Sequence, residues 1–146
     1  MAPPCIFCQI AHGQAPSDQL YADELVMAFL DIAPITPGHA LIIPREHHSS
    51  LTTVPPPTLA AMLSLAARLG QAVLRATKAD GFNLHLANGA VAGQIVMHTH
   101  LHVIPRSPTD GFAWGWRALP AGDAATRQAV ALAVRERLDR MAGHEA

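Results

Sequence analysis

Three histidines alternate with other residues in the segment His98-Thr99-His100-Leu101-His102. The surrounding residues, Ile95 to Pro105, predict a β-strand, in which successive side chains point to opposite faces. We therefore expect all three imidazoles on one face of a sheet, with neighbours about 6.5–7 Å apart. A neutral imidazole can act as a nucleophile, donate a hydrogen bond or bind a metal ion. This row is the first place in the chain to expect chemistry.

The spacing of these histidines fits more than one kind of site. Three imidazoles with one open position are the ligand set of some catalytic zinc centres. The same three rings could instead supply a nucleophile and hydrogen-bond donors for attack on phosphorus. The alternative without chemistry is a set of half-buried histidines satisfied by backbone groups, and strict alternation of three makes it the weakest interpretation. Spacing alone does not decide between the first two.

Composition limits the classes of function. The chain has 146 residues, half of them hydrophobic and 14% charged, which predicts a folded domain with a real core. A net charge of −1 gives no basic footprint for nucleic acid. The uncharged stretch from Ser49 to Ala67 contains Pro55 to Pro57, so we expect no membrane span. Cys5 and Cys8 are too close for a useful disulfide staple, which favours a metal or redox role in the cytoplasm.

The elements that must position the histidines follow from periodicity and turn residues. We expect an α+β fold, with an antiparallel sheet of about five strands and two main helices. The first helix follows Pro57 and stops near Gly81, and the second runs from about Asp123 to Met141. The strands are expected within 19–31 (two strands around a turn), 39–44, 82–86 and 95–105. The expected buried helical positions are Leu59, Met62, Leu63, Ala66, Leu69, Val73 and Leu74 in the first helix, and Val130, Val134 and Leu138 in the second.

An ordered set of motifs from residue 5 to about residue 106 resembles the histidine triad family. The family signature, His-x-His-x-His followed by two apolar residues, is matched by His98 to Ile104. The resemblance implies one histidine triad domain over residues 1–146, with the sheet paired across a homodimer. The other matching segments are 5–8 (CIFC), 29–32 (FLDI), 36–39 (TPGH), 42–47 (IIPREH), 88–89 (NG), 92–94 (AGQ) and 105–106 (PR).

The resemblance also implies an activity and residue roles. It makes His100 the nucleophile that attacks the α-phosphorus of a purine nucleotide derivative, forming a nucleotidyl-histidine that water hydrolyses. His102 would donate a hydrogen bond to a phosphate oxygen. Asp31 would bind the ribose, although a turn-capping aspartate is the alternative. The remaining substrate contacts would come from Ile32 beside the base, with Phe7, Ile10 and Leu30 as further candidates, and from the turn that contains Asn88, Gly93 and Gln94.

A second site is implied at the start of the chain. Cys5, Cys8, His47 and His98 resemble the zinc ligands found in a subset of the family, and a full set of protein ligands would make the zinc structural. Two free thiols without metal are the first alternative, and a thioredoxin-like redox pair is the second. No organic cofactor is expected.

Two positions depart from the family pattern and keep other functions open. Ala87 stands where many members have an asparagine that touches the phosphate, and Ile95 stands where some have serine or threonine near the leaving group. The main hypothesis is hydrolysis of nucleoside phosphoramidates or acyl-adenylate-like compounds. The alternatives are cleavage of dinucleoside polyphosphates, or nucleotide binding with negligible turnover. Trp114 and Trp116 would either cover a neighbouring subunit's nucleotide site or pack in a core.

Overall fold

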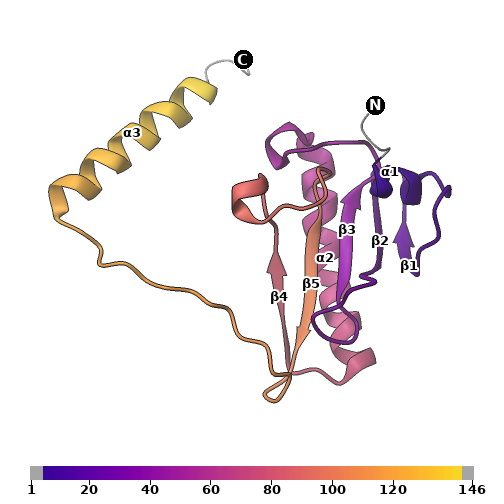
Figure 1. Ribbon diagram of the computed structural model, residues 1–146. Helices are drawn as coiled ribbons and strands as arrows, with labels where there is room; N and C mark the ends of the chain where they lie inside the picture. The colour runs from indigo at the N-terminus through magenta and orange to yellow at the C-terminus, as the bar shows by residue number, and fades with distance from the viewer. Residues whose placement is uncertain (1–4, 143–146) are drawn as a thin grey trace. The chain divides into compact units, whose positions relative to one another are not determined.

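The computed structural model describes residues 5–142, and its centre is a five-stranded antiparallel sheet (Figure 1). The strands lie in the order β1-β2-β3-β5-β4, so β1 and β4 form the two edges. This is the α+β fold and strand number expected from the sequence. The strands are β1 (Gln19–Ala22), β2 (Val26–Leu30), β3 (Ala40–Pro44), β4 (Gly81–His85) and β5 (Leu101–Arg106).

Alternating apolar residues give the sheet two buried faces. In β2, Val26 and Ala28 lie on one face with the long helix α2 (Pro56–Thr77), together with Ile42 of β3. Met27 and Phe29 lie on the other face with Leu41 of β3 and the short helix α1 (Ile6–Ala11). A strand that is buried on both faces shows a continuous apolar run, as the sequences VMAFL and ALIIP do.

The helix α2 confirms most of the expected buried face. Met62, Ala66, Leu69 and Val73 are buried, whereas Leu63 is 61% exposed and Leu65 is buried in its place. Gly81 does not end the helix: α2 ends at Thr77, and Lys78 caps it in a left-handed conformation. Among the described residues, α2 is long and apolar enough to cross a membrane, but the core helix of a soluble protein meets the same criterion, and this one packs on the sheet.

The strand expected over 95–105 is shorter than predicted. Only Leu101–Arg106 forms β5, so His98 and His100 precede the strand rather than lie in it. The backbone N–H of Thr99 donates to the carbonyl of His48 instead of to a neighbouring strand. This hydrogen bond to a loop residue replaces strand pairing at Thr99, and β5 begins two residues later. Within the strand, His102 is paired with Leu41 on β3 and with His85 on β4.

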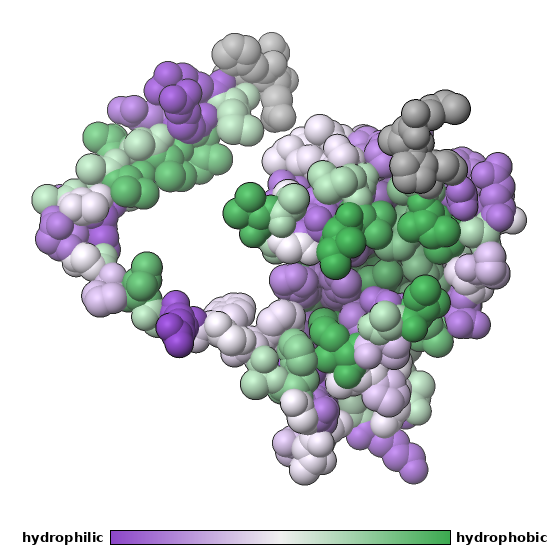
Figure 2. Space-filling model, in the orientation of Figure 1, coloured by the Kyte–Doolittle hydropathy of each residue, from purple (hydrophilic) through white to green (hydrophobic). Residues whose placement is uncertain are grey.

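The described residues fall into two compact units that divide after Phe112. The second unit contains an irregular segment and the helix α3 (Ala124–Ala142). Asp123 caps this helix as expected, because its carboxylate accepts the N–H of Thr126. Apolar side chains lie along α3 (Figure 2), but Val130, Val134 and Leu138 are each more than half exposed. Their expected burial is wrong, since a lone helix has no second layer in its own unit to pack against.

Other expectations about this second unit remain open. Trp116 is 86% exposed, so it does not pack in a core within the described chain. A role for it at a neighbouring subunit stays a prediction, as does the assignment of residues 1–146 to a single domain. Residues 1–4 and 143–146 of that range lie outside the described part of the chain.

At Gly70, α2 lies directly against the ring of Phe82 on β4. A Cβ atom added there would overlap Cζ of Phe82 on β4. We expect Gly70→Ala to destabilise the fold, because the steric cost of about 1–3 kcal/mol exceeds the gain in helix propensity of about 1 kcal/mol. Urea unfolding of this variant beside Gln71→Ala, a change on the exposed side of α2, checks the prediction. A more stable Gly70→Ala protein would show that helix propensity dominates and that the contact is loose.

Candidate active site and metal centre

The ring of His100 is held in one tautomer by its own segment. Its Nδ1 lies 2.7 Å from the carbonyl oxygen of His98. A carbonyl oxygen only accepts hydrogen bonds, so Nδ1 carries the proton and Nε2 keeps its in-plane lone pair. The ring of Phe7 packs edge-on against it, with centroids 5.2 Å apart, and the ring of His102 lies 5.0 Å away. This arrangement leaves one nitrogen of a neutral imidazole available for attack.

The tautomer of His102 is set by a histidine from another strand. The backbone N–H of Ile35 donates to Nδ1 of His39 over 3.0 Å, so the proton of neutral His39 is on Nε2. That Nε2 lies 2.8 Å from Nδ1 of His102. His39 therefore donates to His102, and the remaining proton of His102 must be on its Nε2. The result is a second imidazole beside His100 that presents an N–H group.

Burial keeps the rings of His39 and His102 neutral. Loss of solvent lowers the pKa of His102 to about 4, and the neighbouring His100, His39 and His85 add to the shift. Burial also lowers the pKa of His39, and the carboxylate of Asp31 opposes this. At neutral pH, His102 consequently acts as a neutral hydrogen-bond donor rather than as a cation.

Asp31 lies beside this pair at the end of β2. One of its carboxylate oxygens, Oδ1, accepts the N–H of Ala33 over 2.8 Å, as a turn-capping aspartate does. The other, Oδ2, lies 3.6 Å from Nε2 of His39. The turn-capping hydrogen bond uses Oδ1, which leaves Oδ2 for the expected contact with the ribose. Ile32, the residue expected to lie beside the base, is 94% exposed.

The loop between β4 and β5 is built around Gln94. Its side-chain oxygen accepts the N–H of Gly89, and its amide donates to the carbonyls of Ser49 and Val96. Asn88 is similarly used, because its side-chain oxygen accepts the N–H of Leu51. Both side chains use their oxygens to shape the loop, and the substrate contacts expected from this loop stay a prediction. Gly89 and Gly93 both have φ of 94°, a conformation that residues with a Cβ rarely adopt.

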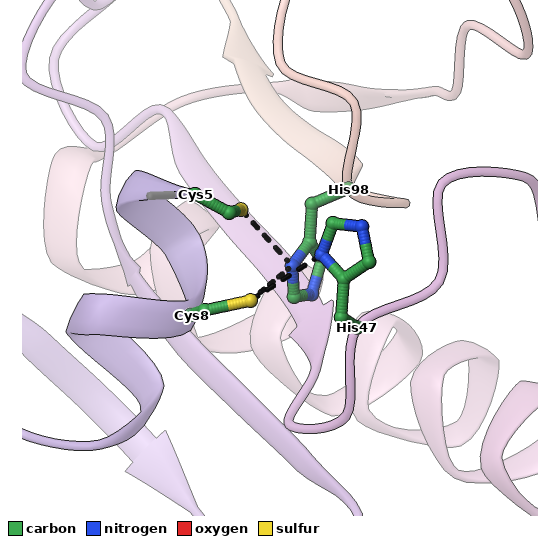
Figure 3. A group of neighbouring side chains, drawn as sticks. All are labelled: Cys5, Cys8, His47 and His98. Carbon is green, nitrogen blue, oxygen red and sulfur yellow. Dashed lines mark hydrogen bonds between the residues drawn. The ribbon is translucent and has the colours of Figure 1, made fainter. Parts of the chain in front are cut away.

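The four residues that resemble zinc ligands converge at one place (Figure 3). The Sγ atoms of Cys5 and Cys8 lie 3.5 and 3.6 Å from Nδ1 of His98, and Sγ of Cys8 lies 3.3 Å from Nδ1 of His47. In a tetrahedral zinc site, a sulfur ligand and a nitrogen ligand are about 3.5 Å apart. The spacing of the donor atoms therefore fits a bound Zn²⁺.

The tautomer of His98 fits the same conclusion. Its Nε2–H donates to the carbonyl of Pro44 over 2.8 Å, which leaves the Nδ1 lone pair directed toward the two thiols. Partial burial and the nearby Cys5 raise the pKa of the Cys8 thiol. A divalent cation is the group that would allow both sulfurs to be thiolates here.

Asp31, His39 and His102 form a second group of potential metal ligands. Their hydrogen bonds oppose metal binding. A metal on Nε2 of neutral His39 would require the ring proton on Nδ1, where the N–H of Ile35 already donates. We therefore assign these residues to hydrogen bonding and the cysteine-containing group to metal.

Sequence reasoning missed His39. His39 directly precedes β3, and its ring contacts His102, the residue that pairs with Leu41 of that strand. Its place beside this strand was visible in the sequence, but the partner, His102, is 63 positions away. The helix α1 was missed as well, although its Phe7 contacts both His98 and His100.

The family model and the similar sequences that match this chain point to the same family. The model of the HIT domain matches residues 12–109. The chain is 44% identical over 106 residues to adenylylsulfatase HINT3 of Arabidopsis thaliana, a match that covers 73% of this chain but only 54% of that protein. It is 38% identical over 117 residues to adenosine 5'-monophosphoramidase hnt1 of Schizosaccharomyces pombe, with 80% and 85% of the two chains covered.

Solved structures agree with this result. A HIT family protein from Bacillus anthracis superposes with a TM-score of 0.87 at 35% identity, covering 94% of this chain and 99% of the other. A zinc-bound histidine triad family protein from Mycobacterium smegmatis gives a TM-score of 0.72 at 37% identity, with 94% and 97% covered. Together with the matched domain, these likenesses show that the chain belongs to the histidine triad family and is a hydrolase of that type.

Proposed function

We propose that this hydrolase cleaves the α-phosphate of purine nucleotide derivatives through a covalent nucleotidyl-histidine on His100. The observation that carries the proposal is the hydrogen bond from Nδ1–H of His100 to the carbonyl of His98. It fixes the neutral tautomer whose Nε2 can attack, and a nucleophile of this kind needs no separate base to remove a proton.

The reaction divides into two displacements. In the first, the Nε2 lone pair of His100 forms a bond to the α-phosphorus, the P–N or P–O bond breaks, and the leaving group departs with the bonding electron pair and takes up a proton from solvent. In the second, water attacks the same phosphorus and gives up a proton to solvent, the bond to His100 breaks, and the nucleoside monophosphate leaves. Across both steps, one water is consumed for each bond cleaved. This division replaces one difficult displacement with two easier ones.

His102 is the proposed donor to the phosphate. Its Nε2–H, fixed by the hydrogen bond from His39, would stabilise charge on a non-bridging oxygen as the phosphorus is attacked. Backbone N–H groups of the loop that contains Asn88, Gly93 and Gln94 would add to this. Phosphoryl-type transfer depends mainly on positioning and charge stabilisation, so donors with fixed protons suit it.

The substrate class follows from the relatives and from the polar groups beside the triad. The two named relatives act as an adenylylsulfatase and an adenosine 5'-monophosphoramidase. Both names describe an adenylyl group with a different leaving group. We infer nucleoside 5'-phosphoramidates and acyl-adenylate-like compounds as substrates, with Oδ2 of Asp31 on the ribose and Ile32 beside the base.

Zinc, dimerisation and location complete the proposal. The zinc would be held by Cys5, Cys8, His47 and His98, where it would cross-link α1 to two distant segments. A second copy would pair with the sheet along an exposed edge strand, which would also protect that edge from other pairing. Two reduced thiols at a metal site suit the cytoplasm.

The variant His100→Ala tests the nucleophile. We expect release of AMP from adenosine 5'-phosphoramidate to fall by about four orders of magnitude or more, since related knock-outs of a covalent nucleophile cost this much. AMP affinity should change little. The unfolding midpoint should fall, because His100 is buried, and circular dichroism should show that the variant is still folded at the assay temperature. The control is Gln71→Ala, which changes an exposed side chain of α2 away from the triad and the candidate metal ligands.

Other outcomes of this assay would redirect the proposal. Equal AMP release by both proteins would remove His100 from the mechanism. Binding of AMP without release by either protein would favour a nucleotide-binding module. Cleavage of diadenosine tetraphosphate in preference to the phosphoramidate would favour the dinucleoside polyphosphate alternative.

Removal of zinc tests the metal assignment. We expect one zinc per chain by elemental analysis, and a lower unfolding temperature after chelation, because a structural metal contributes its binding energy to folding. Cys8→Ser should lower zinc content and remove most of the effect of chelation. Ser107→Ala, a change far from the cluster in sequence, is the control. A protein that holds no zinc when purified from zinc-supplemented medium would contradict the assignment.

The lowered pKa values predict a loss of stability in acid. Below the ordinary pKa near 6.5, the unfolded chain protonates His39 and His102 while the folded chain does not. The stability that they contribute is thus complete above pH 6.5 and is lost as the pH falls toward 4. His102 is only partly buried and solvent screens its ring, so its share of the stability lost in acid is on the order of 1–2 kcal/mol.

Urea unfolding at pH 7 and pH 4.5 measures this effect. We expect the difference in unfolding free energy between the two pH values to be smaller in His102→Gln than in the native protein. Any release of zinc in acid is common to both proteins and cancels in the comparison. Identical differences in the two proteins would mean that His102 is accessible to protons in the folded state.

A further inference from the structure

Phe7 connects the metal centre to the nucleophile. It lies between Cys5 and Cys8 in the sequence and is only 8% exposed. Its ring packs edge-on against the ring of His100 with centroids 5.2 Å apart, and against the ring of His98 at 5.9 Å. The helix α1 and its N-cap residue Cys5 therefore carry two candidate zinc ligands and an aromatic ring that contacts the nucleophile.

His98 makes a second connection between the same two sites. Its ring faces the thiols, as Figure 3 shows, and its side chain is fully buried. Its backbone carbonyl accepts the hydrogen bond that fixes the tautomer of His100. The residue after it, Thr99, is tied to the carbonyl of His48, the neighbour of the candidate ligand His47. The segment that presents His100 is thus held where the metal ligands are held.

These contacts lead to a different expectation from that of a purely structural zinc. A structural zinc would change only the free energy of unfolding, with turnover unaffected as long as the protein is folded. Here, a change in ligation would move Phe7 and His98, two of the groups that lie directly against His100. A displacement of the nucleophile by about 1 Å is enough to cost on the order of a hundredfold in rate.

We propose that Phe7 is a positioning residue for His100, and that zinc binding at Cys5, Cys8, His47 and His98 controls turnover by holding Phe7 and His98 against the nucleophile. The proposal rests on the proposed function in taking His100 as the reacting group and Cys5, Cys8, His47 and His98 as zinc ligands. It assigns the metal centre a second role, control of the catalytic step, in addition to stabilising the fold.

The first test compares two core substitutions of the same kind. Phe7→Leu removes the ring that touches His100, and the control Phe29→Leu removes a ring of the same cluster that lies 5.6 Å from Phe7. With zinc bound, we expect Phe7→Leu to lower kcat by about tenfold to a hundredfold with KM within about twofold. Phe29→Leu should lower the unfolding midpoint but keep kcat within about twofold of the native value. Equal losses of kcat in the two variants would overturn the positioning role.

The second test follows His100 without measuring activity. In the native protein, chelation should shift the ring-proton NMR signals of His100, because the ring current of Phe7 acts on them. The temperature is chosen so that circular dichroism shows the fold intact. The shift should be much smaller in Phe7→Leu. Unchanged signals of His100 on chelation, or a chain that binds no zinc, would overturn the metal-linked part.

The two tests separate this proposal from the proposed function. The NMR shifts report the position of His100 whether or not it is the nucleophile. If His100→Ala keeps its activity while the native signals shift on chelation, the nucleophile assignment fails and the structural link stands. If His100→Ala is inactive while the signals do not move, the nucleophile stands and the link fails.

Discussion

The hydrogen bond between Nδ1–H of His100 and the carbonyl of His98 is the interaction on which the site depends. It decides which nitrogen of His100 has a lone pair, and it requires the backbone at His98 to stay in place. That backbone is anchored by the buried ring of His98, which is held between the carbonyl of Pro44 and the thiols of α1. The tautomer of His100 is thereby fixed by a backbone carbonyl, a group that does not titrate.

The same logic extends to the second histidine. His102 receives its tautomer from His39, and His39 receives its own from the backbone N–H of Ile35. The chain of donors begins at a backbone amide, whose proton is permanent, and ends at the Nε2–H of His102. Burial keeps both rings neutral, so the direction of the donors does not reverse in the physiological range. The proposed chemistry therefore relies on proton positions that the fold sets in advance.

Much of this arrangement could be predicted from the sequence, and the rest shows where local patterns stop being sufficient. Apolar runs located the strands, and the alternation of histidines located the site, because both depend on periodicity. The start of β5 at Leu101 was not predictable in this way, since Thr99 bonds to His48 rather than to a neighbouring strand. The role of His39 was also hidden, because only the register of the sheet brings it to His102. The exposure of Val130 on α3 depends on what lies beside that helix, which helical periodicity does not encode.

The measurement that tests the central claim most directly is a search for the covalent intermediate. The native protein would be mixed with adenosine 5'-phosphoramidate, quenched within the first turnover under alkaline denaturing conditions that preserve phosphorus–nitrogen bonds to histidine, and analysed by intact-mass and peptide mass spectrometry. The account predicts one adenylyl group per chain, on the peptide that contains His100, with fragmentation that places it on His100 and none on His98 or His102. Product formation with no adduct at any quench time, or an adduct on another residue, would contradict the account.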